Sequence, residues 1–578
     1  MTLTCGQACS RSTKRTSSFC ARLIAAFAAG RMVLTFFFCC TMTTTVFTAC
    51  TNDNDDNPLT PPEPEEELAE CTIIWYGTGG GNKDFEIMNN FRQFYRAKPE
   101  TFDHVNIVVQ YKVSTTLFKG MKEQEWKWIE EDLKQYEGMT DEELEDPEMV
   151  ELYHYFCLCH LQPGATYRFA VDPTKSLRKQ LIETAPYGEN NCDFTCADSL
   201  TNFINWAATH YPAKKYILVM ADHGGGYFPA EDLPEEARTR GLIYDDGHIV
   251  NNSKKRFSAK SFARAVKNAN VRPEGIVLYL CLMNNLEFLY EVKDVTDYIT
   301  CSTYTMWPDG GAFEKLADNM ASEPDTRLAL ANFVDANVDS WDDYFYKPED
   351  PEKPSYYDLT LTETKRLNDL APVLKEFTDR LVDTYQNGMP EQRAAINECT
   401  ANAVKVHNKY PFYDMAKYME TLFMELPEVF DFELFQRVST FFNACIVKQR
   451  YAKYLTNHNY QVDYSVLLGV KGTFVKYSYT SLNKLEDATV YYPDGTTEEY
   501  KFVDNGSDSS SGSLASYEFK GSGTWPSTFA DTYQQSTFDR LVGWSRWLFI
   551  NESAPPAWSP SSFKFSLPED DMSEIPVL

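Results

Sequence analysis

The chain has 578 residues, of which 43% are hydrophobic and 14% aromatic, enough to bury the cores of about two to four globular domains. Its formal net charge of −30 at pH 7 argues against a nucleic-acid-binding protein, because phosphate binding requires clustered Lys and Arg. The same charge favours a soluble, self-repelling surface that attracts cationic peptides weakly and over long range.

The first 49 residues have the composition of a secretion signal rather than of a folded segment. A basic lead precedes an uncharged, largely apolar run at 32–49, MVLTFFFCCTMTTTVFTA. A transmembrane helix is the alternative, because the run approaches the roughly 18 residues that suggest a membrane span. The small residues before Cys50 in VFTAC resemble a bacterial lipoprotein cleavage box, and TNDNDD resembles the acidic tract of surface-exposed lipoproteins in Bacteroidetes. The resemblance implies that Cys50 is lipidated and anchors the chain to the outer membrane or cell surface.

Residues 50–70 are acidic and Pro-rich, and they predict a solvated tether with no core of its own. From Cys71 to about residue 320, short apolar runs alternate with helical stretches, interrupted by a charged helical insertion at 119–160. Strands are predicted in TIIWYGT, VNIVVQYK, YRFAVDP, YILVM and GIVLYLCLM. This alternation predicts an α/β fold with a mostly parallel sheet covered by helices on both faces.

Two helix starts are predicted from capping patterns. Asp198 precedes a helix whose apolar residues share one face, and it is predicted to cap that helix. Asn284, with Glu287 three residues later, matches a capping box directly after the strand GIVLYLCLM. A helix is therefore expected to begin close to the end of that strand.

The composition changes beyond residue 320. Residues 325–455 are predicted to be mostly helical and residues 460–550 rich in strands. TVYYPDGTTEEYKF predicts a hairpin, because alternating aromatic residues flank an Asp-Gly turn. We therefore expect a first domain at 71–320 and a C-terminal α+β region at 321–578.

The cysteines do not predict a metal site. Six of the 15 cysteines lie at or before Cys50, which leaves nine, an odd number, so at least one thiol is unpaired within the chain. A zinc site would need a second close pair beside Cys157 and Cys159 or beside Cys192 and Cys196. Packing on helix faces is the interpretation that we favour for both pairs.

Two of the predicted strands are expected to end on reactive side chains. YILVMADHGGG ends on His223, and GIVLYLCLM ends on Cys281. Because the carboxyl ends of parallel strands form sites at one edge of a sheet, the two side chains are expected on one rim although 58 positions (281 − 223) separate them. An imidazole can activate a thiol, and the glycines after His223 let a substrate backbone approach. The amide of Gly224 could donate to an oxyanion.

The segments YPAKKYILVMADHGGGY and IVLYLCLMNNLEFLYEVKDVTDYITCS resemble the clostripain family of cysteine peptidases, in the caspase-like clan. The detailed match covers about 198–315, and a looser one extends from residue 71 and reaches FYDMAKYME at 412–420. The resemblance implies a caspase-like α/β domain with Cys281 as nucleophile and His223 as general acid/base. It also implies an oxyanion hole made by the amides of Gly224 and Cys281, with no triad role for Asp222.

The chain departs from the family pattern in the segments that select the substrate. Tyr279 stands where the family carries an acid that accepts Arg or Lys. Thr303 and Tyr304, after Ser302, stand where the family carries two Glu residues. Because a charge-assisted hydrogen bond contributes about 1.5–3 kcal/mol, a pocket lined by these four residues is expected to lack a strong preference for Arg or Lys.

The sequence thus predicts a secreted, lipid-anchored cysteine endopeptidase that cleaves peptide or protein substrates without a bound cofactor. Some members of the resembled family use calcium, which Asp245 and Asp246 in GLIYDDGH could contact, although a plain turn is the alternative there. The alternative function is a catalytically silent surface lipoprotein that keeps the fold and binds peptides or glycans. An intact Cys–His pair favours the peptidase.

Overall fold

The computed structural model describes residues 68–116, 161–188, 192–227, 241–250, 253–306, 311–351, 353–407, 410–468, 471–479, 485–491, 497–501, 514–522, 533–548 and 550. The predicted signal, the lipidation site, most of the tether and the insertion at 119–160 lie outside these residues. All the described residues belong to one unit, which spans residues 67–578.

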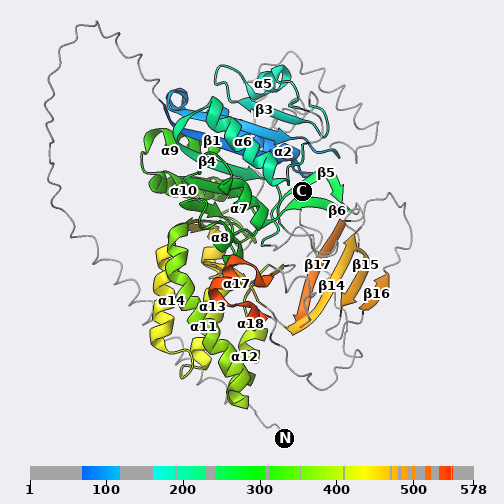
Figure 1. Ribbon diagram of the computed structural model, residues 1–578, viewed down its shortest axis with the longest axis vertical. Helices are drawn as coiled ribbons and strands as arrows, with labels where there is room; N and C mark the ends of the chain where they lie inside the picture. The colour runs from blue at the N-terminus through cyan, green and yellow to red at the C-terminus, as the bar shows by residue number, and fades with distance from the viewer. Residues whose placement is uncertain are drawn as a thin grey trace, which may run out of the picture. The chain divides into compact units, whose positions relative to one another are not determined.

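An eight-stranded sheet carries the structure, in the order β12-β9-β8-β7-β4-β1-β2-β3 (Figure 1). Its strands are β1 (Ala69–Thr78), β2 (Val105–Lys112), β3 (Thr166–Ala170), β4 (Ala213–Ala221), β7 (Gly275–Tyr279), β8 (Tyr298–Cys301), β9 (Asp358–Glu363) and β12 (Ile446–Tyr451). The five central strands pair in parallel, whereas β3, β9 and β12 pair antiparallel at the two edges. The predicted α/β class with a mostly parallel sheet is confirmed.

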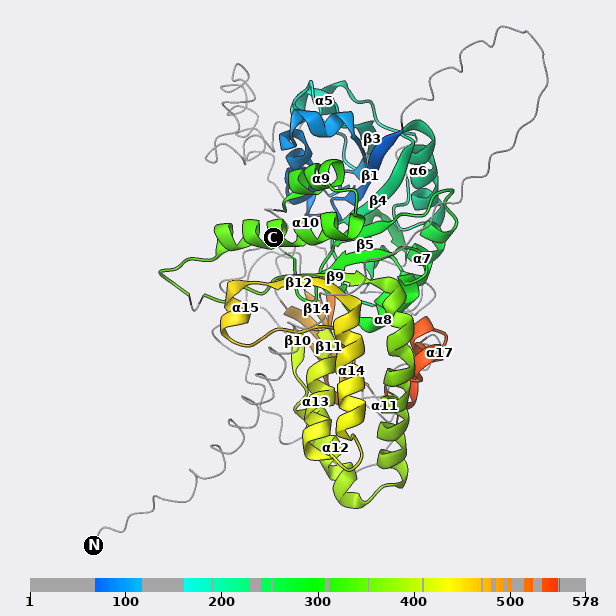
Figure 2. The same cartoon turned by 90° about the vertical axis from the view of Figure 1, so that its left-hand side faces the viewer.

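Helices cover both faces of this sheet (Figure 2). Trp75 of β1 points to one face, where it packs against Phe313 with ring centroids 4.8 Å apart. The next residue, Tyr76, points to the other face and stacks on Phe194 at 4.3 Å. This alternation along a strand buries both faces. The first face is covered by α2 (Asp84–Arg92), α9 (Phe313–Ser322) and α10 (Thr326–Phe345), and the second by α6 (Ala197–His210) and α7 (Ala259–Lys267).

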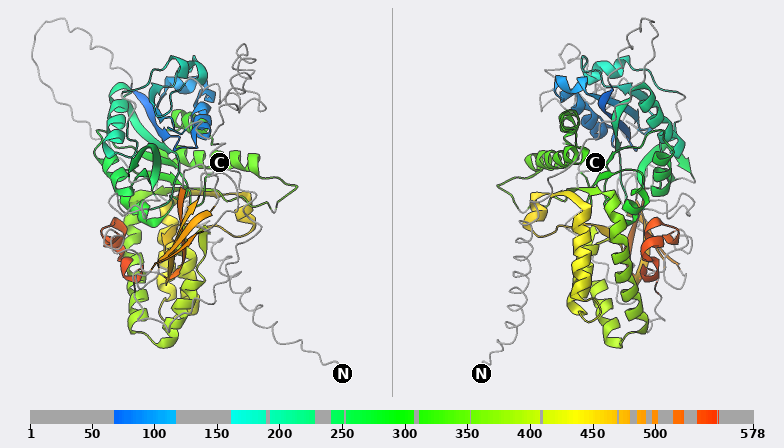
Figure 3. Two further views of the ribbon diagram at one scale, coloured as in Figure 1. Left: turned by 90° about the vertical axis from the view of Figure 1, so that its right-hand side faces the viewer. Right: turned by 60° about the vertical axis from the view of Figure 1, so that its left-hand side comes forward.

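Beyond the β12 edge lies a group of antiparallel helices, α11 (Leu367–Asn387), α12 (Pro390–Ala401), α13 (Met415–Glu425) and α14 (Phe432–Cys445), which are yellow-green and yellow in Figure 3. The short helices α17 (Thr537–Val542) and α18 (Ser545–Leu548) pack on α11. Other short elements are α5 (Leu177–Glu183), α8 (Leu286–Val292), α15 (Lys453–Asn457) and three 3₁₀ helices, η1 (Gln93–Arg96), η2 (Pro99–Asp103) and η6 (Thr364–Arg366). Every helix among the described residues is too short or too polar to cross a membrane.

Three smaller sheets complete the described part. One is the hairpin of β5 (Leu242–Val250) and β6 (Ser253–Phe257). A second has the order β10-β11-β13, from β10 (Lys405–His407), β11 (Tyr410–Asp414) and β13 (Ser465–Leu467). The third has the order β16-β15-β14-β17, from β14 (Lys471–Tyr479), β15 (Leu485–Tyr491), β16 (Thr497–Lys501) and β17 (Leu514–Ser522). The hairpin predicted in TVYYPDGTTEEYKF is confirmed as β15 and β16.

The residues after 320 do not form a separate layer. The boundary expected between residues 320 and 321 falls inside α9 (Phe313–Ser322). Beyond it, β9 pairs with β8 and β12 pairs with β9, so the C-terminal residues extend the central sheet. The change of composition that suggested a boundary therefore falls within one continuous sheet.

Both predicted helix caps differ from the structure by one or two residues. α6 begins at Ala197, so its cap position is Cys196, and Asp198 lies within the first turn. The residue that caps α8 is Asn285, whose Oδ1 accepts from the amide of Phe288 at 3.0 Å. Asn284 is fully buried and makes different contacts, described below.

Candidate active site

The two strands that lead to the predicted reactive residues are parallel neighbours. Ala221, the last residue of β4, pairs with Tyr279, the last residue of β7. His223 and Cys281 each lie two positions beyond this pair (223 − 221 and 281 − 279). The register therefore brings the histidine and the cysteine to the same rim of the sheet, as the sequence predicts.

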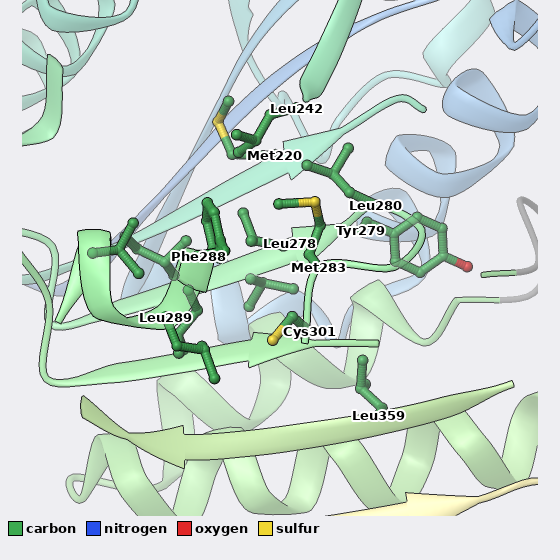
Figure 4. Close-up of a cluster of buried hydrophobic side chains, with 14 of the residues drawn as sticks. Met220, Leu242, Leu278, Tyr279, Leu280, Met283, Phe288, Leu289, Cys301 and Leu359 are labelled. Atoms are coloured by element: carbon green, nitrogen blue, oxygen red, sulfur yellow. The ribbon is translucent and has the colours of Figure 1, made fainter. Parts of the chain in front are cut away.

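Below this rim the strands contribute a dry core (Figure 4). Side chains of β4 and β7 and of the segment that follows β7 are fully buried there, namely Met220, Leu278, Leu280, Met283, Phe288 and Leu289. Such packing holds the ends of both strands in place, because a close-packed interior transmits strain and resists small shifts. The chain segments that carry His223 and Cys281 therefore rest on a rigid base.

The clearest link between the two segments is Gly224. A Cβ atom built on Gly224 would lie 2.1 Å from the carbonyl oxygen and 2.5 Å from the amide nitrogen of Cys281. No side chain fits at these distances, so the residue that follows His223 must be glycine for the two backbones to touch. The structure thus brings the predicted oxyanion residue directly against the predicted nucleophile.

The other two glycines of the HGGG segment also make room for the protein's own chain. The amide of Gly225 donates to the carbonyl of Gly241 at 3.0 Å. Gly226 has a φ of +76°, and a Cβ there would lie 2.2 Å from the ring of Phe412 in β11. The sequence predicts that these glycines give a substrate backbone access, and the structure shows that internal packing already requires glycine at 224 and 226.

The Cys281 thiol is half-buried and contacts backbone amides. The amide of Met306 donates to Sγ at 3.2 Å. Burial raises the pKa of the Cys281 thiol, whereas the amides of Met306 and Gly224 and the positive charge of Lys83 act to lower it. Because burial is the largest effect, the thiol needs a proton acceptor to become a nucleophile at neutral pH.

The imidazole of His223 contacts two protein groups. Its Nε2 is 2.7 Å from Oδ1 of Asn82, and its ring centroid is 5.1 Å from that of Tyr244. Asp222, the preceding residue, accepts a hydrogen bond from the amide of Tyr244. Sequence reasoning did not single out Asn82. The signal was present in GGGN at the end of the first predicted strand, which proves to be the parallel neighbour of β4.

Tyr279, predicted in the specificity pocket, is part of an aromatic cluster beneath the rim. It is 4% exposed and makes an edge contact with Phe313 at 5.1 Å, with Trp341 at 6.0 Å on another side. Figure 4 shows the ring at the end of β7, close to the turn that carries Met283. The side chain fills space in the core and brings no charge to the site.

The other three predicted pocket residues follow β8 and run beside the nucleophile segment. The carbonyl of Tyr304 accepts from the amide of Leu282 at 2.9 Å, and the carbonyl of Ser302 accepts from the amide of Asn284 at 2.9 Å. All three, including Thr303, are buried. Together with Met306 they form what we call the pocket loop, residues 302–306. The structure therefore places this loop against the segment of Cys281.

A buried acid that the sequence did not indicate holds the pocket loop. Oδ1 of Asp358, the first residue of β9, accepts from Ser302 Oγ at 2.6 Å and from the amides of Thr303 at 2.8 Å and Tyr304 at 3.1 Å. Burial raises the pKa of Asp358 to about 6, although these hydrogen bonds act to lower it. Asp358 lies 56 positions after Ser302 (358 − 302), so no local pattern connects them.

Residues from the far end of the chain also support the nucleophile segment. Nδ2 of Asn284 donates to Thr303 Oγ1 and to the carbonyl of Asp463, both at 2.8 Å, and the Asn284 carbonyl accepts from the Ser465 hydroxyl at 3.1 Å. The hydroxyl of Tyr304 donates to the carbonyl of Tyr460 at 2.5 Å. One wall of the site thus depends on residues after 320.

The acids that the sequence offered for calcium have protein partners. Both oxygens of Asp245 accept from Lys112 Nζ at 2.7 Å, and this ion pair is buried. Oδ2 of Asp246 accepts from the hydroxyls of Thr115 and Thr116, both at 2.8 Å. Within the described ranges no group of three or more His, Cys, Asp or Glu side chains is arranged to hold a metal ion. Both carboxylates are thus held by protein donors.

The parallel α/β sheet thus brings a histidine segment and a cysteine segment into contact at its carboxyl rim. The clostripain family model matches residues 127–525, more than half of the chain, and the chain belongs to this family. Clostripain from Hathewaya histolytica is 24% identical over 149 residues, which cover 24% of this chain and 27% of that protein. The alignment therefore spans about a quarter of that relative's length.

Solved structures of C11 cysteine proteases were also found. A secreted C11 cysteine protease from Bacteroides thetaiotaomicron, iotapain, is 16% identical, with 67% of this chain and 87% of that chain covered and a TM-score of 0.44. An inactive zymogen C11 protease from Parabacteroides distasonis is 12% identical, with coverages of 82% and 99% and a TM-score of 0.45.

Proposed function

We propose that the chain is a cysteine endopeptidase in which Cys281 is the nucleophile and His223 the general acid/base. The observation that carries this proposal is the fit of Gly224 against the backbone of Cys281, where a Cβ would lie 2.1 Å from the Cys281 carbonyl oxygen. This contact puts the histidine segment and the cysteine at one point of the rim. A half-buried thiol whose pKa is raised by burial gains most from a neighbouring base.

The reaction begins when the thiol proton of Cys281 moves to the imidazole of His223. The thiolate attacks the substrate carbonyl carbon, a C–S bond forms, and the π electron pair moves to the carbonyl oxygen. As the C–N bond breaks, the imidazolium protonates the leaving amine and a thioester remains. Water then attacks the thioester, one of its protons passes to His223, the C–S bond breaks, and the proton returns to the sulfur.

The oxyanion formed in both steps needs donors that are already in place. The amides of Gly224 and Cys281 take this role in the proposal, and the close packing of the two residues supports it. The Gly224 amide already acts on the Cys281 thiol, where it helps to lower the pKa. Backbone donors held in this way cost no reorganisation when charge develops on the substrate oxygen.

The substrate residue before the cleaved bond is expected to be uncharged or small. A buried cation without a partner charge costs several kcal/mol, and the buried Tyr279 offers no negative charge. The check is kcat/KM for matched substrates that differ only in this residue. A preference for Arg above about 100-fold would overturn the expectation and would indicate that another acidic residue reaches the bound substrate. Tyr279→Asp is unsuitable as a test, because it would bury a charge among Phe313 and Trp341.

The mature protein is proposed to be a lipid-anchored protein of the bacterial outer membrane or cell surface, with Cys50 as its modified N-terminus. The support is VFTAC followed by an acidic tether. Several acyl chains would hold it firmly, whereas one chain anchors weakly. Mass spectrometry of the native N-terminus tests this: a diacyl or triacyl adduct on Cys50 is expected, and an unmodified start elsewhere would contradict it.

The function itself is tested with a peptidyl acyloxymethyl ketone, which alkylates an activated thiol. The mature wild-type chain is expected to be labelled at Cys281 and to cleave peptides, and Cys281→Ala is expected to do neither while keeping its fold. Cys301→Ala, at a fully buried thiol in the next strand, is the matched control and should still be labelled. Full turnover by folded Cys281→Ala, or no labelling of the wild type, would overturn the proposal.

A further inference from the structure

A glycine-rich loop from the first strand lies against the histidine segment. β1 is the parallel neighbour of β4, and Gly77 pairs with Ala221 at their carboxyl ends. The chain then continues through GGGNK at 79–83 before α2 begins at Asp84. This loop, residues 79–83, is therefore on the same rim as His223, although 141 positions separate Asn82 from the histidine (223 − 82).

The loop touches His223 closely enough to exclude a side chain. Gly80 has a φ of +55°, and a Cβ on it would lie 3.1 Å from Cδ2 of His223 and 2.3 Å from Oδ1 of Asp222. A residue with a side chain would be strained by the backbone and would collide with Asp222. The glycine thus allows the loop to lie against the imidazole.

Hydrogen bonds from neighbouring segments hold the loop in this position. The amide of Gly81 donates to Ser114 Oγ at 2.8 Å, and Thr116 Oγ1 donates to the Gly81 carbonyl at 3.0 Å. Within the loop, the amides of Asn82 and Lys83 donate to the carbonyl of Gly79 at 3.0 and 2.7 Å. The backbone at Asn82 is therefore held by hydrogen bonds on both sides of the loop, although the Asn82 side chain is exposed.

The contact between Asn82 and His223 selects a tautomer. The amide Oδ1 of asparagine can only accept, so the imidazole Nε2, 2.7 Å away, must donate. In a neutral ring with its proton on Nε2, the lone pair is on Nδ1. Resting on the proposed function, we propose that Asn82 is a positioning residue that holds His223 in the Nε2–H tautomer, so that Nδ1 takes the proton from the Cys281 thiol.

Lys83 supports the same assignment from the neighbouring position. Its positive charge acts on the Cys281 thiol and favours the thiolate. Its Nζ lies 3.8 Å from Glu86, one turn into α2, which keeps the side chain at the base of the loop. The groups that face the thiol and the imidazole thus include Lys83, Asp222 and Tyr244.

The test compares Asn82→Ala, Asn82→Asp and the wild type in the mature chain. Asn82→Ala is expected to lower kcat about 10- to 100-fold with KM unchanged, because the proton transfer is disturbed and substrate binding is not. Asn82→Asp keeps an acceptor for Nε2–H and is expected to retain kcat within about fivefold. Its negative charge should raise the imidazole pKa of His223 relative to the wild type, followed by ¹⁵N NMR with His223→Ala used for assignment.

The NMR signals also report the tautomer without any need for activity. The wild type and Asn82→Asp are expected to show the Nε2–H form at high pH, and Asn82→Ala a mixture of both forms. Asn106→Ala is the matched control, because Asn106 bonds Thr72 near the other end of the sheet, and it should match the wild type. If Asn82→Ala kept the wild-type kcat and the wild-type tautomer of His223, the role of Asn82 would be overturned and the proposed peptidase function would stand. An inactive wild type would overturn the proposed function.

Discussion

The two sides of the proposed site are built in different ways. The histidine side consists of His223 and Gly224, next to the end of β4, with the GGGNK loop of the neighbouring strand against them. The pocket side consists of residues 302–306, held by Asp358 from β9 and by residues 460–465 from beyond α15. Short, glycine-rich segments make the first side, and long-range polar contacts make the second.

Because the two sides are built differently, the fold tolerates changes of side chain on the pocket side but not on the histidine side. On the histidine side the backbones touch, so a single added Cβ meets another backbone at 2.1 Å. On the pocket side the side chains can vary as long as Asp358 finds its three donors, of which two are backbone amides. Thr303 and Tyr304 can therefore replace acidic residues without loss of the loop, which is consistent with a changed substrate preference.

The largest effect is expected for Gly224→Ala. The added Cβ must push apart the segments of His223 and Cys281, and it would displace an oxyanion donor, so kcat/KM is expected to fall about 1000-fold or more. Gly188→Ala is the control, because a Cβ there meets nothing within 4 Å, although its φ of +66° costs roughly 1–2 kcal/mol of stability. Equal activity of both variants would show that the two segments need not touch.

The next effect concerns the pocket side and depends on pH. Burial raises the pKa of Asp358 from its ordinary value of 3.8 to about 6, so the folded protein holds this proton more tightly than the unfolded chain. The stability contributed by the protonated form is complete below about pH 4 and is lost as pH rises through 6. At about 1.4 kcal/mol per pKa unit, the loss amounts to roughly 3 kcal/mol.

Asp358→Asn keeps the Oδ1 acceptor and cannot ionise, so it should escape this loss. Its free energy of unfolding, measured with urea from pH 4 to 7, is expected to gain about 2.4 kcal/mol relative to the wild type over that range. Asp414, whose pKa burial raises to about 7, titrates in both proteins and cancels in the difference. If the free energies of unfolding of the two proteins changed with pH in the same way, the pKa of Asp358 would not be raised in the folded protein.

The smallest expected effect is that of Tyr304→Phe, which removes the hydrogen bond to the carbonyl of Tyr460. Since Tyr460 is 49% exposed, water can replace the donor, and the cost should be about 1 kcal/mol or less. Tyr290→Phe is a matched change that leaves the buried carbonyl of Leu367 without its Tyr donor, and it should cost about 1–3 kcal/mol. Thermal unfolding of both variants measures the difference, and the reverse order would contradict the assigned burial.

Local patterns were sufficient for the central strands and for the histidine side of the site. Apolar runs of strand length alternating with amphipathic helices predicted β1, β2, β4 and β7, because side-chain periodicity and burial are properties of a few consecutive residues. The HGGG segment after β4 and the cysteine after β7 could be placed on one rim from sequence, because parallel neighbours end on the same side.

The residues that meet at that rim from distant parts of the chain could not be read from local patterns. Asn82 contacts His223 because β1 lies beside β4, and Asp358 contacts Ser302 because β9 joins the edge of the sheet antiparallel to β8. Strand order and direction depend on the packing of the whole core, and no short stretch of sequence encodes them. For the same reason, composition suggested a boundary near residue 320, whereas β9 and β12 from beyond it belong to the central sheet.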